Sequence, residues 1–372
     1  MVPDLADAGE GRSVADALID RLGEPFAVSG LELGVGAAFG VAVGPDHGDD
    51  PVTLLQRADI AMYTAKAHGD GSAQLFSAEL VTAGTRRLRL AGEIRTALDE
   101  GLLDVHFQPI ADLRSGKVVS AEALVRWHHS EHGWVPPPDI VGLAEHLGLL
   151  RQLTLFVLRS AVRQCATWRD SDFDVQVSVN LAAQSLIDVG LVSDVQRELR
   201  DAGLDPGRLV LEITETQVIR DPDQALQVLR GLSEIGITLA VDDFGTGFSS
   251  LSYLTRLPVN EIKIDRSFVA NMLSDDTSAK VVRSIVELGK SLGRVVVAEG
   301  IEDLVTWDVL AAMGCDRGQG YHLSRPLNAE RLTPWLTGRA RPLPAPSPAA
   351  PVVSRPEDRP PHSSSPSRST AH

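Results

Sequence analysis

Polar side chains, most of them acidic or amide, recur where the predicted strands end, and this recurrence is the chemically most informative feature of the sequence. The residues concerned are Glu122, Asn180, Glu212, Asp242, Asp243, Lys263, Asp265, Glu299, Glu302 and Gln319. Taken singly, a Glu or Asn after a strand is more often a helix cap or a surface residue than a ligand. Repetition from strand to strand favours one shared site, and carboxylate and amide oxygens suit Mg²⁺ or Mn²⁺ rather than zinc.

The adjacent carboxylates Asp242 and Asp243 make the prediction of a metal site more specific. Neighbouring negative charges repel each other and destabilise a partly buried strand end unless cations lie between them. Two metal ions roughly 3.5–4 Å apart are the usual arrangement for in-line cleavage of a phosphodiester. The segment that follows, 244–250, is glycine-containing. It is either an ordinary loop or a mobile loop that completes the site on binding, and the spacing favours the second.

Strand-like segments alternating with amphipathic helices predict an α/β fold, a TIM-like (β/α)8 barrel. The strands are expected at 103–108, 118–126, 175–180, 209–213, 237–242, 261–265, 295–299 and, more weakly, 319–323. In such a barrel the carboxyl ends of the strands share one mouth, where active sites form. The connection between the first two strands, 111–117, is too short for a parallel crossover, so one strand should run antiparallel.

The chain divides into three predicted parts. Residues 1–80 form a small partial α/β piece, with a helix at 14–22, a strand pair within 31–43 and a helix from Pro51. Residues 81–336 hold the barrel, and a helix at 77–100 links it to the first piece. Residues 339–372 are rich in Pro, Ser and Arg with little to bury, which predicts a disordered, solubilising tail.

Composition excludes several classes of protein. The 372 residues include 35 Lys and Arg against 50 Asp and Glu, a net charge of −15, so no DNA partner is expected. The two cysteines, Cys165 and Cys315, lie in no metal or redox pattern, which favours a reducing compartment. The longest apolar run, 33–44, is far shorter than the roughly 20 residues that span a bilayer, and the first residues resemble no signal peptide. We therefore expect a cytoplasmic protein with no membrane segment.

Several ordered motifs give residues 87–336 a strong resemblance to an EAL domain, the bacterial family that hydrolyses cyclic di-GMP. They are Phe107-Gln-Pro-Ile110, Glu122-Ala-Leu-Val-Arg-Trp127, Val179-Asn-Leu181, Leu211-Glu-Ile-Thr-Glu215, Asp242-Asp-Phe-Gly-Thr-Gly-Phe-Ser-Ser-Leu251, Lys263-Ile-Asp265, Ala298-Glu-Gly-Ile-Glu302 and Gln319-Gly-Tyr321. Family members are TIM-like barrels with one reversed strand, in agreement with the short connection described above.

The resemblance implies a role for each matched residue. The metal ligands, for two Mg²⁺ or Mn²⁺ ions, would be Glu122, Asn180, Glu212, Asp242, Asp243 and Glu299. Glu299, Lys263 and Glu122 would be catalytic, with Lys263 orienting the attacking water and offsetting negative charge. The residues that would bind substrate are Arg126, Gln108, Asp265 and Gln319. Glu215 would anchor the loop after Asp243 and couple it to dimer contacts, and Glu302 would support the site.

The implied reaction is metal-dependent opening of cyclic di-GMP to linear pGpG by a homodimer that associates through its EAL domain. Ca²⁺ should inhibit, because it prefers more ligands at longer distances than Mg²⁺. The alternative is a catalytically weak receptor that binds the dinucleotide and signals through a partner. The sequence departs from the family pattern at Ser130, Ala182, Phe248 and Asp303, none of which is a predicted ligand.

The N-terminal piece resembles the second half of a GGDEF, or diguanylate cyclase, domain. Residues 34–42 match its late strand pair and residues 55–66 its late helix, while the nucleotide-binding signature is absent. We therefore expect no cyclase activity from this piece. It is either a vestigial scaffold or the product of a truncated gene model.

Overall fold

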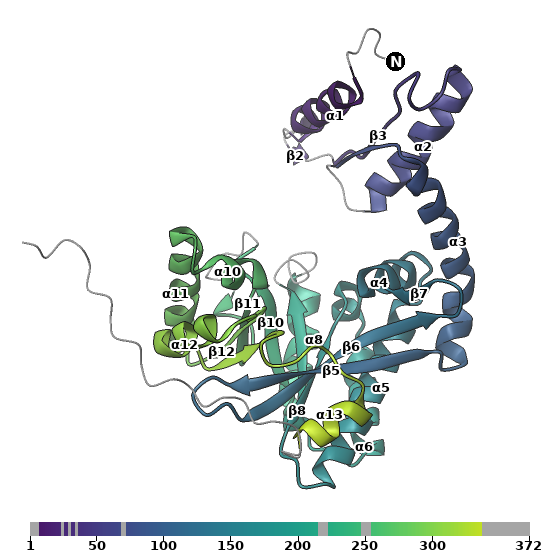
Figure 1. Cartoon of the computed structure of the whole chain (residues 1–372). Coiled ribbons are helices and arrows are strands. Elements are labelled where there is room, and N and C mark those ends of the chain that lie inside the picture. The colour runs from purple at the N-terminus through teal and green to yellow at the C-terminus, as the bar shows by residue number, and fades with distance from the viewer. Residues whose placement is uncertain are drawn as a thin grey trace, which may run out of the picture.

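The computed structural model describes residues 7–23, 26–28, 31–33, 36–67, 72–214, 222–246 and 254–336. The tail predicted at 339–372, the loop residues 247–250 with Phe248, and Glu215 lie outside the described residues. In Figure 1 the long helix α3 (Ala78–Asp99) joins an N-terminal α/β unit to a barrel. The barrel carries nearly all of the predicted site.

Eight strands of the described residues close into the barrel (Figure 1). They are β5 (Leu103–Asp112), β6 (Val118–His129), β8 (Gln176–Asn180), β9 (Leu209–Thr214), β10 (Thr238–Phe244), β11 (Glu261–Ile264), β12 (Val295–Ala298) and β13 (Arg317–Gln319). Their order is β5-β13-β12-β11-β10-β9-β8-β6, and β6 pairs back onto β5. β5 runs antiparallel to both of its neighbours, while the other pairs around the barrel are parallel. The predicted barrel with one reversed strand is confirmed.

The eighth strand lies earlier in the chain than the sequence pattern indicated. It was expected at 319–323 and is found at Arg317–Gln319. After Gln319 the chain turns, because the backbone N–H groups of Leu323 and Ser324 both donate to the carbonyl of Gly320, each at 3.1 Å. Gln319 therefore ends this strand instead of starting it, which places its side chain at the mouth of the barrel.

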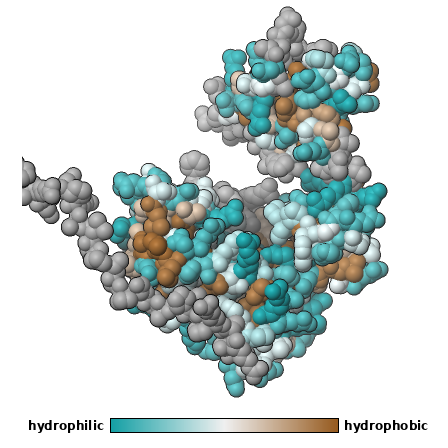
Figure 2. Space-filling view, in the orientation of Figure 1, coloured by the Kyte–Doolittle hydropathy of each residue, from teal (hydrophilic) through white to brown (hydrophobic). Residues whose placement is uncertain are grey.

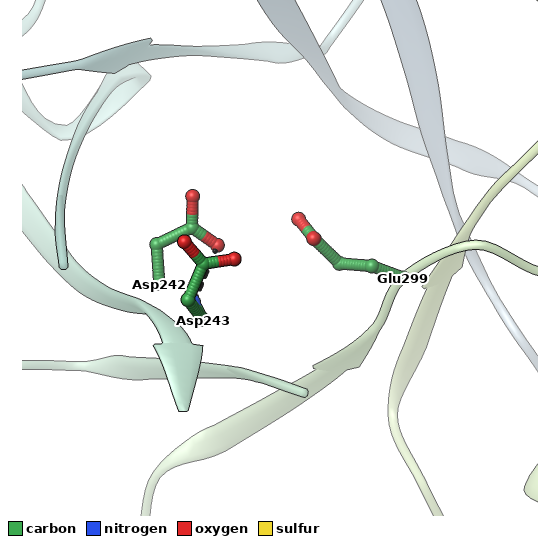
Figure 3. A group of neighbouring side chains, drawn as sticks. All are labelled: Asp242, Asp243 and Glu299. Carbon is green, nitrogen blue, oxygen red and sulfur yellow. Dashed lines mark hydrogen bonds between the residues drawn. The ribbon is translucent and has the colours of Figure 1, made fainter. Parts of the chain in front are cut away.

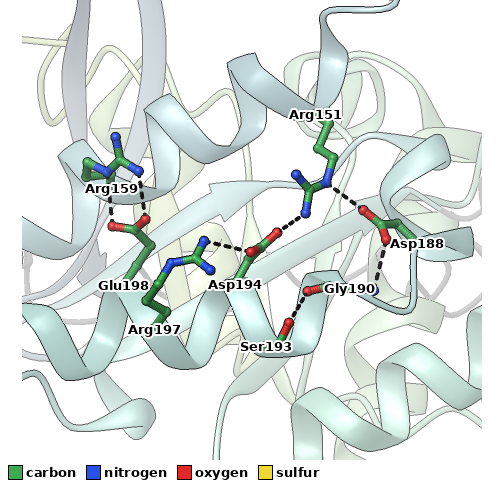
Figure 4. Close-up of polar contacts among 8 residues, drawn as sticks. All are labelled: Arg151, Arg159, Asp188, Gly190, Ser193, Asp194, Arg197 and Glu198. Atoms are coloured by element: carbon green, nitrogen blue, oxygen red, sulfur yellow. Dashed lines mark hydrogen bonds and ion pairs between the residues drawn. The ribbon is translucent and has the colours of Figure 1, made fainter.

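Helices cover the outside of the barrel and bury their apolar faces against it. They are α4 (Pro137–His146), α5 (Leu150–Arg169), α6 (Leu191–Asp201), α8 (Pro222–Glu234), α10 (Arg266–Asn271), α11 (Asp276–Ser291), α12 (Leu304–Met313) and α13 (Ala329–Leu336), with short 3₁₀ turns η1 (Ala183–Ile187) and η2 (Pro206–Arg208). Figure 4 shows how ion pairs join α5 to α6: Arg159 donates to Glu198 at 3.1 and 2.9 Å, and Arg151 to Asp194. Leu158 on α5 and Val195 on α6 are both buried in the core of the barrel.

The N-terminal unit consists of α1 (Ala8–Leu22), β1 (Phe26–Val28), β2 (Leu31–Leu33), β3 (Phe39–Val41), α2 (Pro51–Ala67) and β4 (Ala73–Leu75). Two strands lie within 31–43, as predicted, but their expected pairing with each other is wrong. β2 pairs antiparallel with β1, and β3 pairs in parallel with β4. The reason is that α2 serves as the crossover between β3 and β4, and its backbone packs directly on Gly40.

In the described part of the chain no helix has the length and apolar character needed to cross a membrane. Figure 2 shows a surface that is mostly hydrophilic on the visible face, with apolar side chains gathered in separate patches. On α2, Val52, Leu55 and Met62 are among the exposed apolar residues.

Candidate active site

The barrel mouth gathers its acidic residues around one buried lysine. Lys263, on β11, is 1% exposed, and its Nζ lies 2.7 Å from an oxygen of Glu212 and 2.6 Å from one of Glu299. Asp242 is 3.3 Å and Glu122 is 3.9 Å from the same nitrogen. These four acids come from β6, β9, β10 and the end of β12. The convergence expected of a barrel therefore brings together residues far apart in the sequence.

Burial disfavours the charged form of the acidic residues in this group. It raises the pKa of Glu212 well above its usual range, and Lys263 offsets only part of that shift. The pKa of Glu299 rises to about 8, again mainly through burial, with Lys263 acting in the opposite direction. Burial also lowers the pKa of Lys263, yet the surrounding carboxylates outweigh it, so this pKa is raised and the lysine stays charged. One ammonium group faces four carboxyl groups, so the mouth has excess negative charge for divalent cations to neutralise.

Amide side chains hold Glu122 in place. Asn180 donates its Nδ2 to one oxygen of Glu122 at 2.7 Å, and Gln319 donates its Nε2 to the other at 2.5 Å. The Gln319 amide also reaches Gln108 at 3.2 Å, and Gln108 lies opposite Glu122 in the β5–β6 register. Because Asn180 uses its nitrogen for Glu122, its amide oxygen is left as a possible metal ligand.

A second acidic group lies at the edge of the first. Figure 3 shows Asp242 and Asp243, at the end of β10, pointing with Glu299 toward a common space. Oxygens of these three residues lie within 4.8 Å of one another, as ligands of one metal ion would. Asp243 has a φ of 52°, uncommon for a residue other than glycine. Burial, and then the charges of Asp242 and Asp265, raise its pKa to about 6. The acids at this edge suit a hard divalent cation.

The predicted substrate residues differ in their surroundings. Arg126 is half-buried and donates to the carbonyl of Val125 at 2.8 Å. Burial lowers the pKa of the Arg126 guanidinium, and the charge of Glu122 offsets part of this shift. Asp265 caps α10 by accepting the backbone N–H of Ser267 at 2.9 Å. A helix cap was the ordinary alternative for such a residue, and Asp265 has that role here.

Of the two residues predicted to support the site, Glu302 is exposed, and Glu215 lies outside the described residues. A polar pair below the mouth was not predicted from the sequence: Arg317 donates to Glu261 at 2.6 Å inside the barrel. The two-residue spacing of Glu261 and Lys263 on β11 was the available signal, because such residues face the same side of a strand.

The closed α/β barrel and the carboxylates at its mouth define the protein as a TIM-like barrel with a site suited to divalent cations. The EAL domain family model matches residues 91–326, and the chain belongs to that family. A diguanylate cyclase (GGDEF domain) model matches residues 2–72, ahead of the EAL domain. Both parts of the resemblance seen in the sequence are thereby confirmed.

Curated relatives include proteins named as cyclic di-GMP phosphodiesterases. The chain is 37% identical over 88% of its length to the bifunctional diguanylate cyclase/cyclic di-GMP phosphodiesterase MucR of Pseudomonas aeruginosa, covering 48% of that protein. It is 35% identical over 87% of its length to the cyclic di-GMP phosphodiesterase PdeR of Escherichia coli, covering 49% of it. The chain thus spans about half the length of these relatives.

Two solved structures have a fold similar to that of the barrel. The MucR phosphodiesterase in complex with cyclic di-GMP is 41% identical, with a TM-score of 0.64, and the match covers 66% of this chain and 99% of that one. The FimX EAL domain of Pseudomonas aeruginosa bound to cyclic di-GMP is 26% identical, with a TM-score of 0.59, over 64% of this chain and 96% of that one.

Proposed function

We propose that this protein hydrolyses cyclic di-GMP to linear pGpG in a reaction that depends on Mg²⁺ or Mn²⁺. The observation that carries the proposal is the arrangement of Glu122, Glu212, Asp242 and Glu299 around Lys263 at the barrel mouth. The similarity to the MucR phosphodiesterase and its cyclic di-GMP complex supports the choice of substrate.

The residues present fit a pair of divalent ions. The ligands would be Glu122, Asn180, Glu212, Asp242, Asp243 and Glu299. Such ions, when bound, activate water and stabilise charged phosphoryl oxygens. The raised pKa values of Glu299 and Asp243 reflect burial without enough positive charge nearby, as an acidic site built for cations would show.

The chain's own residues supply position and charge. Lys263 is held by Glu212 and Glu299, which fixes a positive charge beside the place where negative charge develops on the phosphate. Gln319 and Asn180 each bind one oxygen of Glu122 and so fix its orientation. Arg126 lies near Glu122 and has guanidinium donors beyond the one used by Val125, which suits it to a phosphate oxygen.

Turnover of cyclic di-GMP by the full chain with Mg²⁺ tests the proposal. Glu122→Ala should lower kcat by at least about a hundredfold, since a positioned group of this kind contributes about 10²–10⁴-fold. The exposed Glu145→Ala on α4 is the matched control and should keep full activity. Turnover that survives Glu122→Ala would overturn the assignment.

Ca²⁺ added to the Mg²⁺ enzyme should inhibit it. Calcium takes six to eight oxygen ligands at longer distances, whereas magnesium demands near-ideal octahedral geometry. Calcium should therefore occupy the carboxylates without supplying the geometry of in-line attack. Unchanged turnover in excess Ca²⁺ would contradict this expectation.

The second candidate is a receptor that binds the dinucleotide and signals through a partner. The full set of carboxylates together with Lys263 favours the enzyme, and binding without turnover in both Mg²⁺ and Mn²⁺ would favour the receptor. Association of two copies through the EAL domain belongs to the same proposal, and sedimentation of the full chain tests it.

A further inference from the structure

A pair of opposite charges lies inside the barrel, on the side of Lys263 away from the mouth. Arg317, at the start of β13, donates from its Nη1 to an oxygen of Glu261, at the start of β11, at 2.6 Å. The same nitrogen reaches the side-chain oxygen of Gln176 on β8 at 3.5 Å, so these contacts cross the interior of the barrel. The Glu261 side chain is 8% exposed and that of Arg317 20% exposed. The pair is therefore largely removed from water.

Glu261 is within reach of the lysine at the centre of the site. Glu261 and Lys263 are two residues apart on β11, so their side chains leave the strand on the same side, about 6.5 Å apart along it. The Lys263 ammonium points to the mouth, because it contacts Glu212 and Glu299 at 2.7 and 2.6 Å. Two long side chains that start this close can also meet each other. Glu261 is thus a further carboxylate that could bind the same ammonium.

The interior beside the pair is lined in part by small side chains. Ser120 lies opposite Gln176 in the β6–β8 register, and Ala240 lies opposite Glu261 in the β10–β11 register. Barrels of this class ordinarily carry bulky branched residues at inward positions. The hydroxyls of Ser120 and Ser178 are buried and make no hydrogen bond within the described residues. They can accept a hydrogen bond from a lysine that turns toward Glu261.

We propose that Arg317 is a positioning residue that keeps Glu261 from drawing the Lys263 ammonium away from the mouth. The inference rests on the proposed function, because it explains how Lys263 stays beside the reacting phosphate. A carboxylate bound by a guanidinium has its charge offset and its lone pairs occupied. Without Arg317, the buried carboxylate of Glu261 would lack a partner, which is costly, and Lys263 is the cation that β11 itself provides.

The competition for Lys263 should be strongest when divalent ions are bound. Two such ions bring a charge of +4 to the −5 of the predicted carboxylate ligands, which are Glu122, Glu212, Asp242, Asp243 and Glu299. The mouth then attracts Lys263 less strongly than it does in the metal-free protein. A free Glu261 carboxylate on the other side would compete better in that form, so Arg317 matters most in the form that is proposed to act on substrate.

Two substitutions that break the same ion pair separate this role from a merely structural one. Arg317→Gln leaves the Glu261 carboxylate free and should lower kcat for cyclic di-GMP about 10- to 100-fold, the usual effect of removing a partner that supports a metal site. KM should stay nearly unchanged, because neither residue lies at the mouth. Glu261→Gln leaves no carboxylate to compete and should keep kcat close to that of the wild type. The double variant Arg317→Gln/Glu261→Gln should recover the activity that Arg317→Gln loses.

Arg208→Gln is the matched control. Arg208 pairs with Asp174 at 2.8 Å and its side chain is 27% exposed, but the Asp174 side chain is 79% exposed, so water replaces the lost contact. Its turnover should equal that of the wild type. An unchanged kcat in Arg317→Gln, an equal loss in Glu261→Gln, or no recovery in the double variant would overturn the inference.

If Arg317→Gln does not fold, Glu261→Gln and the double variant decide. Activity retained in both supports the inference, and a loss of about tenfold or more in either overturns it.

Crystal structures of the variants grown with Mn²⁺ give a readout that does not depend on turnover. In Arg317→Gln the Nζ of Lys263 should lie within about 4 Å of a Glu261 oxygen, the range of an ion pair. In the double variant it should lie at Glu212 and Glu299 again. A lysine that stays at the mouth in Arg317→Gln would overturn the inference. If the wild type does not hydrolyse cyclic di-GMP, the proposed function fails, and these structures still decide what holds Lys263.

Discussion

At the scale of single residues, the site depends on the balance between Lys263 and the acids that surround it. A buried carboxylate that loses its partner costs several kcal/mol, because neither water nor a counter-charge replaces the lost ion pair. Glu212 and Lys263 are both 1% exposed, so this pair is of that kind. The same acids are the predicted metal ligands, so stability and metal binding should be coupled.

Replacing Lys263 by methionine should therefore destabilise the metal-free protein. The expected loss is about 3 kcal/mol in the free energy of unfolding. Mg²⁺ should reduce the loss, because cations then offset the carboxylates that Lys263 no longer faces. Urea unfolding of the full chain with and without Mg²⁺ measures both effects.

Lys280→Met is the matched control, since Lys280 pairs with Asp276 on the surface with 78% of its side chain exposed. Surface pairs contribute little, so its unfolding curve should overlay the wild type. An equal effect of the two substitutions would contradict the role given to burial.

The raised pKa of Glu299 predicts a pH dependence with a definite sign. Its pKa is about 8 in the folded protein against an ordinary value of 4.5. Between these pH values the folded state keeps a proton that the unfolded state releases, so folding becomes less favourable as pH rises through this window. Metal ligands must be deprotonated, so Mg²⁺ should bind more tightly over the same range and release protons.

Thermal unfolding of the metal-free protein across this pH window, with the Glu299→Gln variant beside it, measures the contribution. The wild-type Tm should fall relative to that of Glu299→Gln as pH rises. The difference should shrink when Mg²⁺ is present. Parallel curves for the two proteins would show that Glu299 does not titrate in this range.

At the scale of elements, α3 and the hairpin of β6 with β7 (Gly133–Val135) are joined at a buried histidine. His129, 4% exposed, faces the Glu93 carboxylate on α3 at 2.9 Å. Its other ring nitrogen accepts the backbone N–H groups of Glu131 and His132 at 3.1 and 3.3 Å. This one side chain therefore holds the hairpin turn and also ties it to the helix.

His129→Ala should lower the free energy of unfolding by about 1–3 kcal/mol, because it leaves backbone donors of the turn without a partner. Glu93→Ala should cost well under 1 kcal/mol, since the Glu93 side chain is 57% exposed and water replaces the contact. Urea unfolding of both variants gives the comparison. A larger loss of stability from Glu93→Ala would mean that His129 stabilises the protein mainly through its contact with α3 and not through the turn.

The sequence predicted the barrel elements well because their patterns are local. The reversed strand followed from the short connection at 111–117, and the structure confirms it. The eighth strand was misplaced because its end is set by the contact of Gly320 with Ile301, which no local pattern reveals. The pairing expected between the two strands within 31–43 was wrong for the same reason, since packing of α2 on Gly40 decides the partner of β3.

The candidate site was predictable in part. Spacing along alternating strands pointed to the acids, and Lys263 was found with them. The sequence could not show that Asp265 caps α10, nor that Arg317 and Glu261 pair inside the barrel, because such partners depend on the final register.

At the scale of the whole molecule, the chain contains two units with separate cores joined by α3. Leu90, Ile94 and Ala97 of α3 are buried and belong to the core of the barrel. The N-terminal unit has a shallower core, since all three residues of β3 are only half-buried. The barrel should therefore withstand a change that disrupts the N-terminal unit.

Gly40→Ala makes that change, because a Cβ at Gly40 would overlap backbone atoms of Ala58 and Met62 on α2. Overpacking of this kind costs about 1–3 kcal/mol, which corresponds to a change of about 5- to 150-fold in the opening equilibrium of the unit. Hydrogen exchange should thus accelerate in residues 39–67 and stay unchanged in the barrel strands, with turnover of cyclic di-GMP retained. Gly84→Ala on α3, where nothing lies within 4 Å of the added Cβ, is the control and should alter neither unit. Faster exchange throughout the barrel in Gly40→Ala would mean that the two units fold as one, and that the N-terminal unit supports the site through α3.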